Sequence, residues 1–228
     1  TPGIGKTTLC SEFPDALFLT TETGSKSLSI YDRPIKKWSN FVSAIKLLKE
    51  DKQFKNIILD RVDKLYDMCF KYMCDTVLMI DHPQDEKDYG KSWGEINKEY
   101  YKWIDKLLAL DKGVVMVSHQ QEKEIKTLSG LEFNKLTPLV RKGPEYIHGQ
   151  VDCIFYYTMK GNRRYLFLQE DDYITAKQRI KNHFFTKKGE RVISINCGDS
   201  SEEAYKNLMR AYNLSLIHIS EPTRPTLI

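Results

Sequence analysis

The sequence predicts an α/β fold, in which a mostly parallel sheet is flanked by helices and followed by a β-hairpin. Three short apolar runs, at residues 16–20, 56–60 and 113–118, alternate with segments of helical periodicity. Strands that are apolar along their whole length are typical of parallel sheets with both faces covered. The chain of 228 residues is long enough to bury one sizeable core.

The expected helices lie before and between these strands. A first helix opens at residues 7–13. Apolar residues recur at helical spacing through 38–50 and 62–79, and residues 93–110 form a long amphipathic pattern. The polar stretch 82–89 contains a proline, so we expect a loop there.

The second half of the chain has a different pattern. Residues 120–149 are polar, charged and only weakly periodic, which is typical of a loop region. The runs 151–158 and 164–169 flank a Gly-Asn dipeptide, which favours a tight turn, so we expect a β-hairpin. Residues 192–196 match one more strand.

The composition is that of an ordinary globular protein. No apolar run reaches the ~20 residues that a membrane-spanning helix needs. The formal net charge of +4 permits contact with nucleic acid but does not indicate it. The five cysteines form no C-x-x-C pair and no common zinc spacing, so we expect free thiols in a reducing cytoplasm. These are Cys10, Cys69, Cys74, Cys153 and Cys197.

The first eight residues carry a phosphate-binding motif. They read TPGIGKTT and match the last part of G-x-x-x-x-G-K-[ST]. The first glycine of that motif and the central strand that feeds the loop would precede residue 1, so we expect an N-terminally truncated chain. The alternative is a chance Gly-Lys-Thr in a turn.

This motif predicts ATP and Mg²⁺ as cofactors. Backbone N–H groups of the loop would surround phosphate oxygens, and the helix that follows adds its positive end. Lys6 would reach the β- and γ-phosphates, and the Thr7 hydroxyl would bind Mg²⁺. The expected nucleotide-binding residues are Pro2, Gly3, Ile4, Gly5, Lys6, Thr7 and Thr8.

Two carboxylates follow apolar strands. Asp60 ends the second strand, the Walker B arrangement that holds the metal through water. Asp63 is the competing metal candidate, but it lies past the strand end and is suited to capping the next helix. Glu22 follows the first strand, where it could orient the attacking water or be a solvated loop carboxylate.

A polar residue also closes the third strand at the same edge. His119 follows Ser118 there and could sense the γ-phosphate. A structural histidine with satisfied hydrogen bonds is the alternative.

Together these motifs resemble the RecA-like P-loop ATPase core. More closely, they resemble the phage-encoded RecA-like ATPases linked to single-strand annealing, an AAA-labelled family. The resemblance covers roughly residues 1–179. The matching segments are residues 2–8 (PGIGKTT), 18–22 (FLTTE), 57–60 (IILD), 89–93 (YGKSW), 115–119 (VMVSH) and 176–179 (AKQR).

The resemblance implies roles for individual residues. Glu22 would be the catalytic base, and His119 or Gln120 would couple the nucleotide state to DNA-binding loops. Lys177 and Arg179 would reach the γ-phosphate of a neighbouring subunit, although a solvated strand edge explains both equally well.

The resemblance also implies partners: single-stranded DNA, and further copies of the chain in a ring or filament that serves recombination or annealing. Residues 120–149 would be the DNA-facing loop. Their near-balanced charge is a weak phosphate footprint, and a solvated loop explains it almost as well. Phe133 and Tyr146 are among the few aromatics that could stack on bases.

The end of the chain does not fit this family. Residues 214–224 resemble the translation of a transposon-type sequencing adapter, so we expect an ATPase domain over 1–213 and a non-native tail over 214–228. Two functional alternatives remain: a P-loop kinase of a nucleotide or small molecule, and a non-catalytic nucleotide switch.

Overall fold

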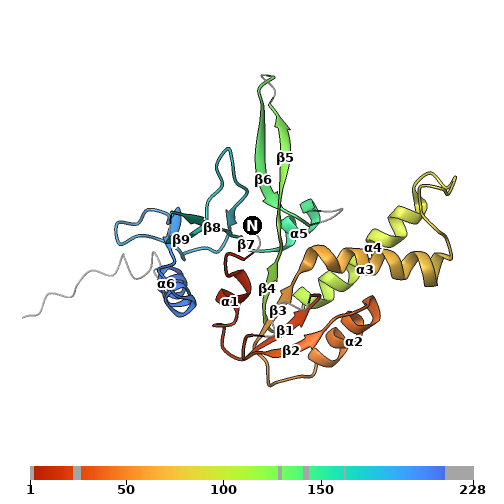
Figure 1. Cartoon of the computed structure of the whole chain (residues 1–228), viewed down its shortest axis with the longest axis horizontal. Helices are drawn as coiled ribbons and strands as arrows, with labels where there is room; N and C mark the ends of the chain where they lie inside the picture. Colours follow the sequence, from red (N-terminus) through yellow and green to blue (C-terminus); the bar gives the residue numbers. More distant parts are fainter. Residues whose placement is uncertain (1–2, 23–26, 128–129, 141–143, 162, 214–228) are drawn as a thin grey trace, which may run out of the picture. The chain divides into compact units, whose positions relative to one another are not determined.

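The computed structural model describes residues 3–22, 27–127, 130–140, 144–161 and 163–213 (Figure 1). Pro2 and the expected tail at 214–228 lie outside these residues. The chain forms two compact units, each treated by itself below. One comprises Lys6–Gln121 and Pro138–Gly149, and the other comprises Thr1–Gly5, Glu122–Thr137 and Gln150–Ile228.

The first unit contains a parallel four-stranded sheet in the order β2-β1-β3-β4. Strands β1 (Ala16–Thr20), β3 (Asn56–Asp60) and β4 (Gly113–Val117) match the three predicted apolar runs. The sequence analysis missed β2 (Tyr31–Pro34), because all four of its residues are exposed and it contains a proline. Both properties are typical of an edge strand.

Helices flank this sheet on both sides, as predicted. Helix α1 (Lys6–Cys10) lies on one side, and α2 (Trp38–Leu48), α3 (Val62–Tyr72) and α4 (Lys91–Leu108) lie on the other (Figure 1). Because successive side chains of a strand point to opposite faces of the sheet, the apolar strands offer buried side chains to the helices on both sides.

The core of this unit is apolar and aromatic. Ile57, Ile58 and Leu59 of β3 are fully buried. The ring of Tyr100 packs edge-on to Tyr66, with centroids 5.1 Å apart, and 6.0 Å from Trp38. On the α1 side the buried cluster consists of Cys10, Ala16, Phe18, Ile58 and Val117.

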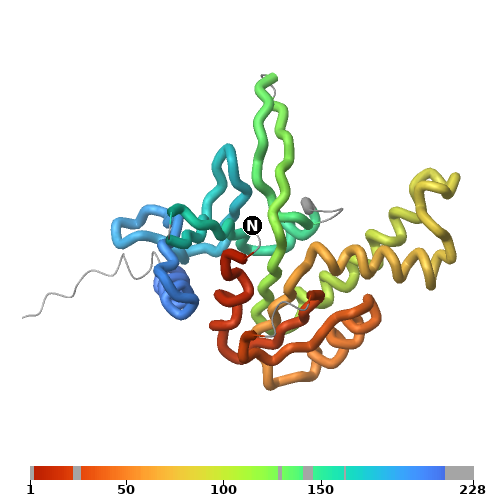
Figure 2. The backbone as a smooth tube through the Cα atoms, in the orientation of Figure 1, coloured from red at the N-terminus to blue at the C-terminus, as the bar shows by residue number. Residues whose placement is uncertain are grey.

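The helix predicted at 62–79 is divided. Helix α3 ends at Tyr72 and continues as a π-helix, η1 (Met73–Leu78), which stops at Met79 in the left-handed region with φ 53°. The backbone trace shows α3 and α4 side by side, joined through η1 and residues 79–90 (Figure 2). The sequence analysis predicted one continuous α-helix over 62–79 and missed the π-helix η1.

The region expected to be a polar loop contains regular structure. Strands β5 (Gln120–Lys126) and β6 (Glu132–Pro138) form a two-stranded hairpin, and α5 (Pro144–Gln150) follows. The loop interpretation was therefore wrong for most of 120–149. Charged residues on both faces of the hairpin conceal the alternation on which strand prediction depends.

The other unit contains the predicted C-terminal hairpin, β8 (Tyr156–Lys160) and β9 (Arg163–Phe167), which is antiparallel. The predicted strand near 192–196 is β11 (Ser194–Asn196), which pairs with β9. Strand β7 (Cys153–Ile154) pairs with β10 (Lys177–Gln178), and α6 (Ser201–Asn213) ends the described chain.

Among the described residues, no helix is both long enough and apolar enough to cross a membrane.

Candidate nucleotide-binding site

Three adjacent strands end side by side. The register pairs Thr20 of β1 with Asp60 of β3, and Asp60 with Val117 of β4. Thr21 N donates to Asp60 O at 2.8 Å, and Arg61 N donates to Thr21 Oγ1 at 3.0 Å. The residues that follow each strand therefore lie together at the carboxyl edge of the sheet, where open α/β sheets bind ligands.

The first contact at this edge joins the phosphate-binding motif to the strand-ending carboxylate. Thr7 Oγ1 donates to Asp60 Oδ2 at 2.7 Å. Burial raises the pKa of Asp60, while the Thr7 hydrogen bond and the Arg61 charge lower it. Burial also lowers the pKa of Lys6, and the Asp60 charge opposes that shift. Lys6, Thr7 and Asp60 thus form one electrostatic group.

These residues fit a magnesium ion that is shared with a phosphate ligand. The protein offers a hydroxyl and a carboxylate, both hard oxygen donors. In the part of the chain that the structure describes, no cluster of three or more His, Cys, Asp or Glu side chains could hold a metal. Mg²⁺ commonly keeps several waters and binds through one or two protein oxygens plus phosphates.

The loop before α1 has the backbone that its glycines predict. Gly3 and Gly5 have φ values of +77° and +91°, a region that side-chain-bearing residues rarely adopt. Within its own unit, the carbonyl of Ile4 accepts a hydrogen bond from Arg164 Nε at 3.0 Å. Sequence analysis did not find Arg164, because its position in β9 gives no local signal.

Glu22 lies at the same edge, paired with two cations. Its Oε1 lies 2.9 Å from Arg61 Nη2 and 2.8 Å from Lys64 Nζ. The Lys64 hydrogen bond is the largest influence on the pKa of Glu22, which lies below its usual range, and the Arg61 charge acts in the same direction. Glu22 is therefore ionised at neutral pH and close to Asp60, as the ATPase interpretation requires.

Arg61 is the functional candidate that sequence analysis missed. Its side chain is only 11% exposed and also contacts Asp63 Oδ2 at 3.3 Å and the His119 ring at 2.5 Å. Asp63, the competing metal candidate, therefore lies against Arg61 and is buried, whereas Thr7 contacts Asp60. The sequence signal that could have identified Arg61 is its position directly after Asp60, the carboxylate that ends β3.

His119 contacts this cluster from the end of β4. Burial lowers its pKa, and the adjacent Arg61 charge lowers it further, so the imidazole is neutral at pH 7. Its carbonyl accepts from Leu139 N at 2.6 Å. The neighbouring Gln120 begins β5.

Lys177 and Arg179, which the resemblance assigns to the γ-phosphate of a neighbouring subunit, lie in the other unit. Arg179 Nη2 donates to Val151 O at 3.1 Å, and Arg179 N donates to Asp152 O at 2.9 Å. Lys177 lies in β10, and burial lowers its pKa. Lys177 is half-buried, whereas Arg179 is exposed.

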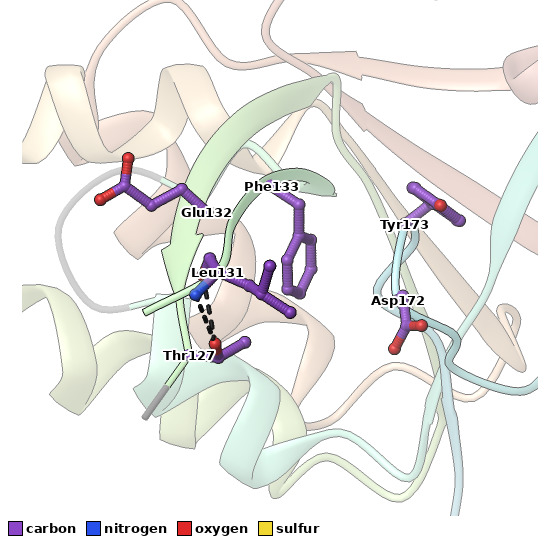
Figure 3. A pocket seen from close by; sticks show the side chains of 6 residues that line it. All are labelled: Thr127, Leu131, Glu132, Phe133, Asp172 and Tyr173. Carbon is purple, nitrogen blue, oxygen red and sulfur yellow. Dashed lines mark hydrogen bonds between the residues drawn. The ribbon is translucent and has the colours of Figure 1, made fainter. Parts of the chain in front are cut away.

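The hairpin region holds a recess that contains one of the two predicted stacking aromatics (Figure 3). Leu136 N donates to Tyr173 O at 2.7 Å, and Thr175 N donates to Leu136 O at 2.8 Å, which attaches a second segment to β6. The recess is lined by Thr127, Leu131, Glu132, Phe133, Asp172 and Tyr173.

Two lysines of the hairpin are paired with glutamates. Lys126 pairs with Glu132 at 2.7 Å, and Lys135 pairs with Glu170 at 2.5 Å, so these lysines are already neutralised. Tyr146, the other predicted aromatic, lies in the first unit. There it stacks on Tyr101 with centroids 3.9 Å apart and donates to Asp105.

Two comparisons with known proteins match this chain. A family described as "AAA domain" matches residues 1–180. The SPbeta prophage-derived uncharacterized protein YorG of Bacillus subtilis (strain 168) is 26% identical over 125 residues, which make up 52% of this chain and 38% of YorG. The match thus spans well under half the length of that relative.

Proposed function

This chain belongs to the AAA domain family, and from that premise we propose that it is an ATP-binding, Mg²⁺-dependent ATPase that acts with single-stranded DNA. The observation that carries the nucleotide part is the 2.7 Å hydrogen bond from Thr7 to Asp60. It joins the Gly-Lys-Thr motif to a strand-ending carboxylate across 53 residues of sequence, which a chance motif in a turn would not do.

The site residues divide the work of phosphoryl transfer. Lys6 binds the β- and γ-phosphates, while Thr7 and Asp60 hold the magnesium ion. When bound, the ion neutralises charge on the phosphate oxygens. Glu22 orients the attacking water, and His119 at the end of β4 responds to the presence of the γ-phosphate.

The DNA part of the proposal rests on the family resemblance and on the hairpin. YorG is described as prophage-derived, which agrees with a phage origin, whereas the role in recombination or annealing rests on the family resemblance. Phe133 and Tyr173 offer aromatic faces in the recess beside β6, and unpaired bases stack on such faces without sequence preference. Assembly as a ring or filament would allow Lys177 and Arg179 to act on a neighbour.

The test is the steady-state ATPase rate of the purified protein with and without single-stranded DNA. We expect Mg²⁺-dependent turnover that single-stranded DNA stimulates and double-stranded DNA does not. Turnover that requires a small-molecule acceptor would indicate a kinase instead. Nucleotide binding without any turnover would indicate a nucleotide switch.

Lys6→Ala ties that activity to the site. We expect it to abolish nucleotide binding, measured by calorimetry with a non-hydrolysable ATP analogue, because it removes the cation at the phosphates. Lys98→Ala, an exposed lysine on α4, is the matched control and should bind normally. Retained affinity in Lys6→Ala would refute the assignment of Lys6.

A further inference from the structure

One buried cation lies at the centre of the strand-end cluster. Arg61 follows β3 directly, and its guanidinium contacts Glu22 beyond β1 at 2.9 Å and His119 beyond β4 at 2.5 Å. Its neighbours therefore come from both strands that flank β3.

The position of Arg61 is held from several directions. Thr21 Oγ1 accepts from Arg61 N at 3.0 Å and donates to Arg61 O at 3.2 Å, so the backbone is clamped to the end of β1. Asp63, whose side chain is 5% exposed, contacts the guanidinium at 3.3 Å. A side chain with its backbone and head group both held has little freedom, which suits it to positioning another group.

This arrangement is not optimised for stability. Arg61 Nε and Asp63 Oδ1 are buried and have no hydrogen-bond partner among the described residues. Unsatisfied buried polar atoms cost free energy, and buried ion pairs are weak sources of stability. Such clusters concentrate at functional sites, where their geometry serves the chemistry.

We propose that Arg61 is a positioning residue that sets the Glu22 carboxylate for water orientation and ties it to His119. The proposal rests on the ATPase function proposed above. Both cations that contact Glu22 do so at Oε1. The water that attacks the γ-phosphate is then oriented by Oε2.

Charge decides which task Glu22 performs. A carboxylate that faces two cations has little affinity for a proton, so Glu22 orients the water and the proton leaves with the phosphate oxygens. The charged and titratable groups around it are Arg61 just before α3, Lys64 in α3, His119 just after β4, and Asp60 at the end of β3. His119 must be neutral to accept the Arg61 contact, since an imidazolium would repel the guanidinium.

The test uses substitutions at Arg61 in the whole chain. Arg61→Met keeps the length of the side chain but removes its charge. We expect kcat to fall about 10²-fold, as positioning errors do, while affinity for a non-hydrolysable ATP analogue is kept. The acid limb of the kcat–pH profile should move to higher pH, because Glu22 loses one of its two cations.

Two further variants separate charge from geometry. Arg61→Lys keeps the cation but cannot bridge Glu22 and His119, so the acid limb should stay in place while kcat remains low. Lys64→Met removes the other cation without touching His119, and it should shift the acid limb with a smaller loss of kcat. Full kcat in Arg61→Lys would overturn the positioning role.

A direct titration makes the result independent of turnover. Carboxyl NMR of the nucleotide-free protein should show a higher Glu22 pKa in Arg61→Met than in the wild type. If the wild type does not hydrolyse ATP, the proposed function fails whatever the titration shows. If the wild type hydrolyses ATP but Arg61→Met keeps its kcat and its acid limb, only the role of Arg61 fails. Should Arg61→Met not fold, Arg61→Lys and Lys64→Met carry the same test.

Discussion

Two carboxylates at one sheet edge have opposite electrostatic surroundings. Burial raises the pKa of Asp60, so this residue gains most from a nearby cation. Two cations lower the pKa of Glu22, so this residue stays charged without a ligand. When the surroundings of two titratable groups move their pKa values in opposite directions, the two groups can perform different tasks in one site. Here they suit Asp60 to holding a metal and Glu22 to orienting water.

Asp60→Asn tests the metal assignment at this scale. The amide keeps the size of the side chain but not its charge, so we expect Mg²⁺ to enhance ATP affinity roughly 10- to 100-fold less than in the wild type. The measurement is calorimetric titration with and without Mg²⁺. Affinity in the absence of Mg²⁺ should change little, because Lys6 is intact.

Asp15→Asn is the matched control for that experiment. Asp15 precedes β1 at the opposite end of the strand and pairs with Lys55 at 3.1 Å. Its φ of 49° is one that asparagine adopts readily. If Mg²⁺ enhanced the ATP affinity of Asp60→Asn as much as that of the wild type, the assignment of Asp60 as a metal ligand would be wrong.

At the scale of elements, the helices and strands predicted from the apolar pattern agree with the structure where an element has a fully buried face. Strands β1, β3 and β4 and helix α4 lie close to their predicted bounds because each packs an unbroken apolar face. Pattern failed for β2, which is exposed, and for β5 and β6, which are charged. Strands of that kind are held by their backbone partners, which a local pattern does not reveal.

Leu107→Ala tests whether α4 supplies the core of its unit. Leu107 is fully buried, so its truncation should lower the free energy of unfolding by about 2–5 kcal/mol. Leu47→Ala in α2 is the same substitution at a side chain that is 61% exposed, and it should change stability by only about 0.5 kcal/mol. Urea denaturation followed by circular dichroism compares the two. Equal losses would contradict the core position of α4.

At the scale of the whole molecule, the chain forms two compact units, and the family match at 1–180 includes residues of both. The predicted domain boundary at residue 213 remains a prediction. Glu22, the candidate metal ligands and His119 belong to the first unit, while Arg179 and the recess beside β6 belong to the other. Action of Arg179 on a neighbouring subunit remains a proposal, and its test needs several copies of the chain.

Arg179→Ala should spare ATP binding but reduce DNA-stimulated turnover by roughly 10³-fold if Arg179 reaches a neighbour's γ-phosphate. The arginine is already anchored to Val151 O, so Arg210→Ala, an exposed arginine on α6, controls for general loss of charge. The measurement is the ATPase rate on single-stranded DNA.

Mixed assemblies make that test specific for action in trans. A Lys6→Ala subunit should not bind nucleotide, but it carries an intact Arg179. It should therefore restore turnover at the site of an Arg179→Ala neighbour. Neither variant should turn over alone. A mixture that stays inactive, although the two variants co-assemble, would place Arg179 outside the neighbour's site.

The sequence alone determined the order of β1, β3, β4 and the helices around them, the phosphate-binding motif, and the placement of Asp60, Glu22 and His119 after strands that share an edge. These follow from local pattern, because burial of one face or both imposes a period on nearby residues. Tertiary structure decided the rest: the edge position of β2, the pairing of β6 with residues 173–175, and the Arg61 contacts to Glu22 and His119. Such contacts join residues that are 39 to 58 positions apart for Arg61, and only strand register and packing bring them together.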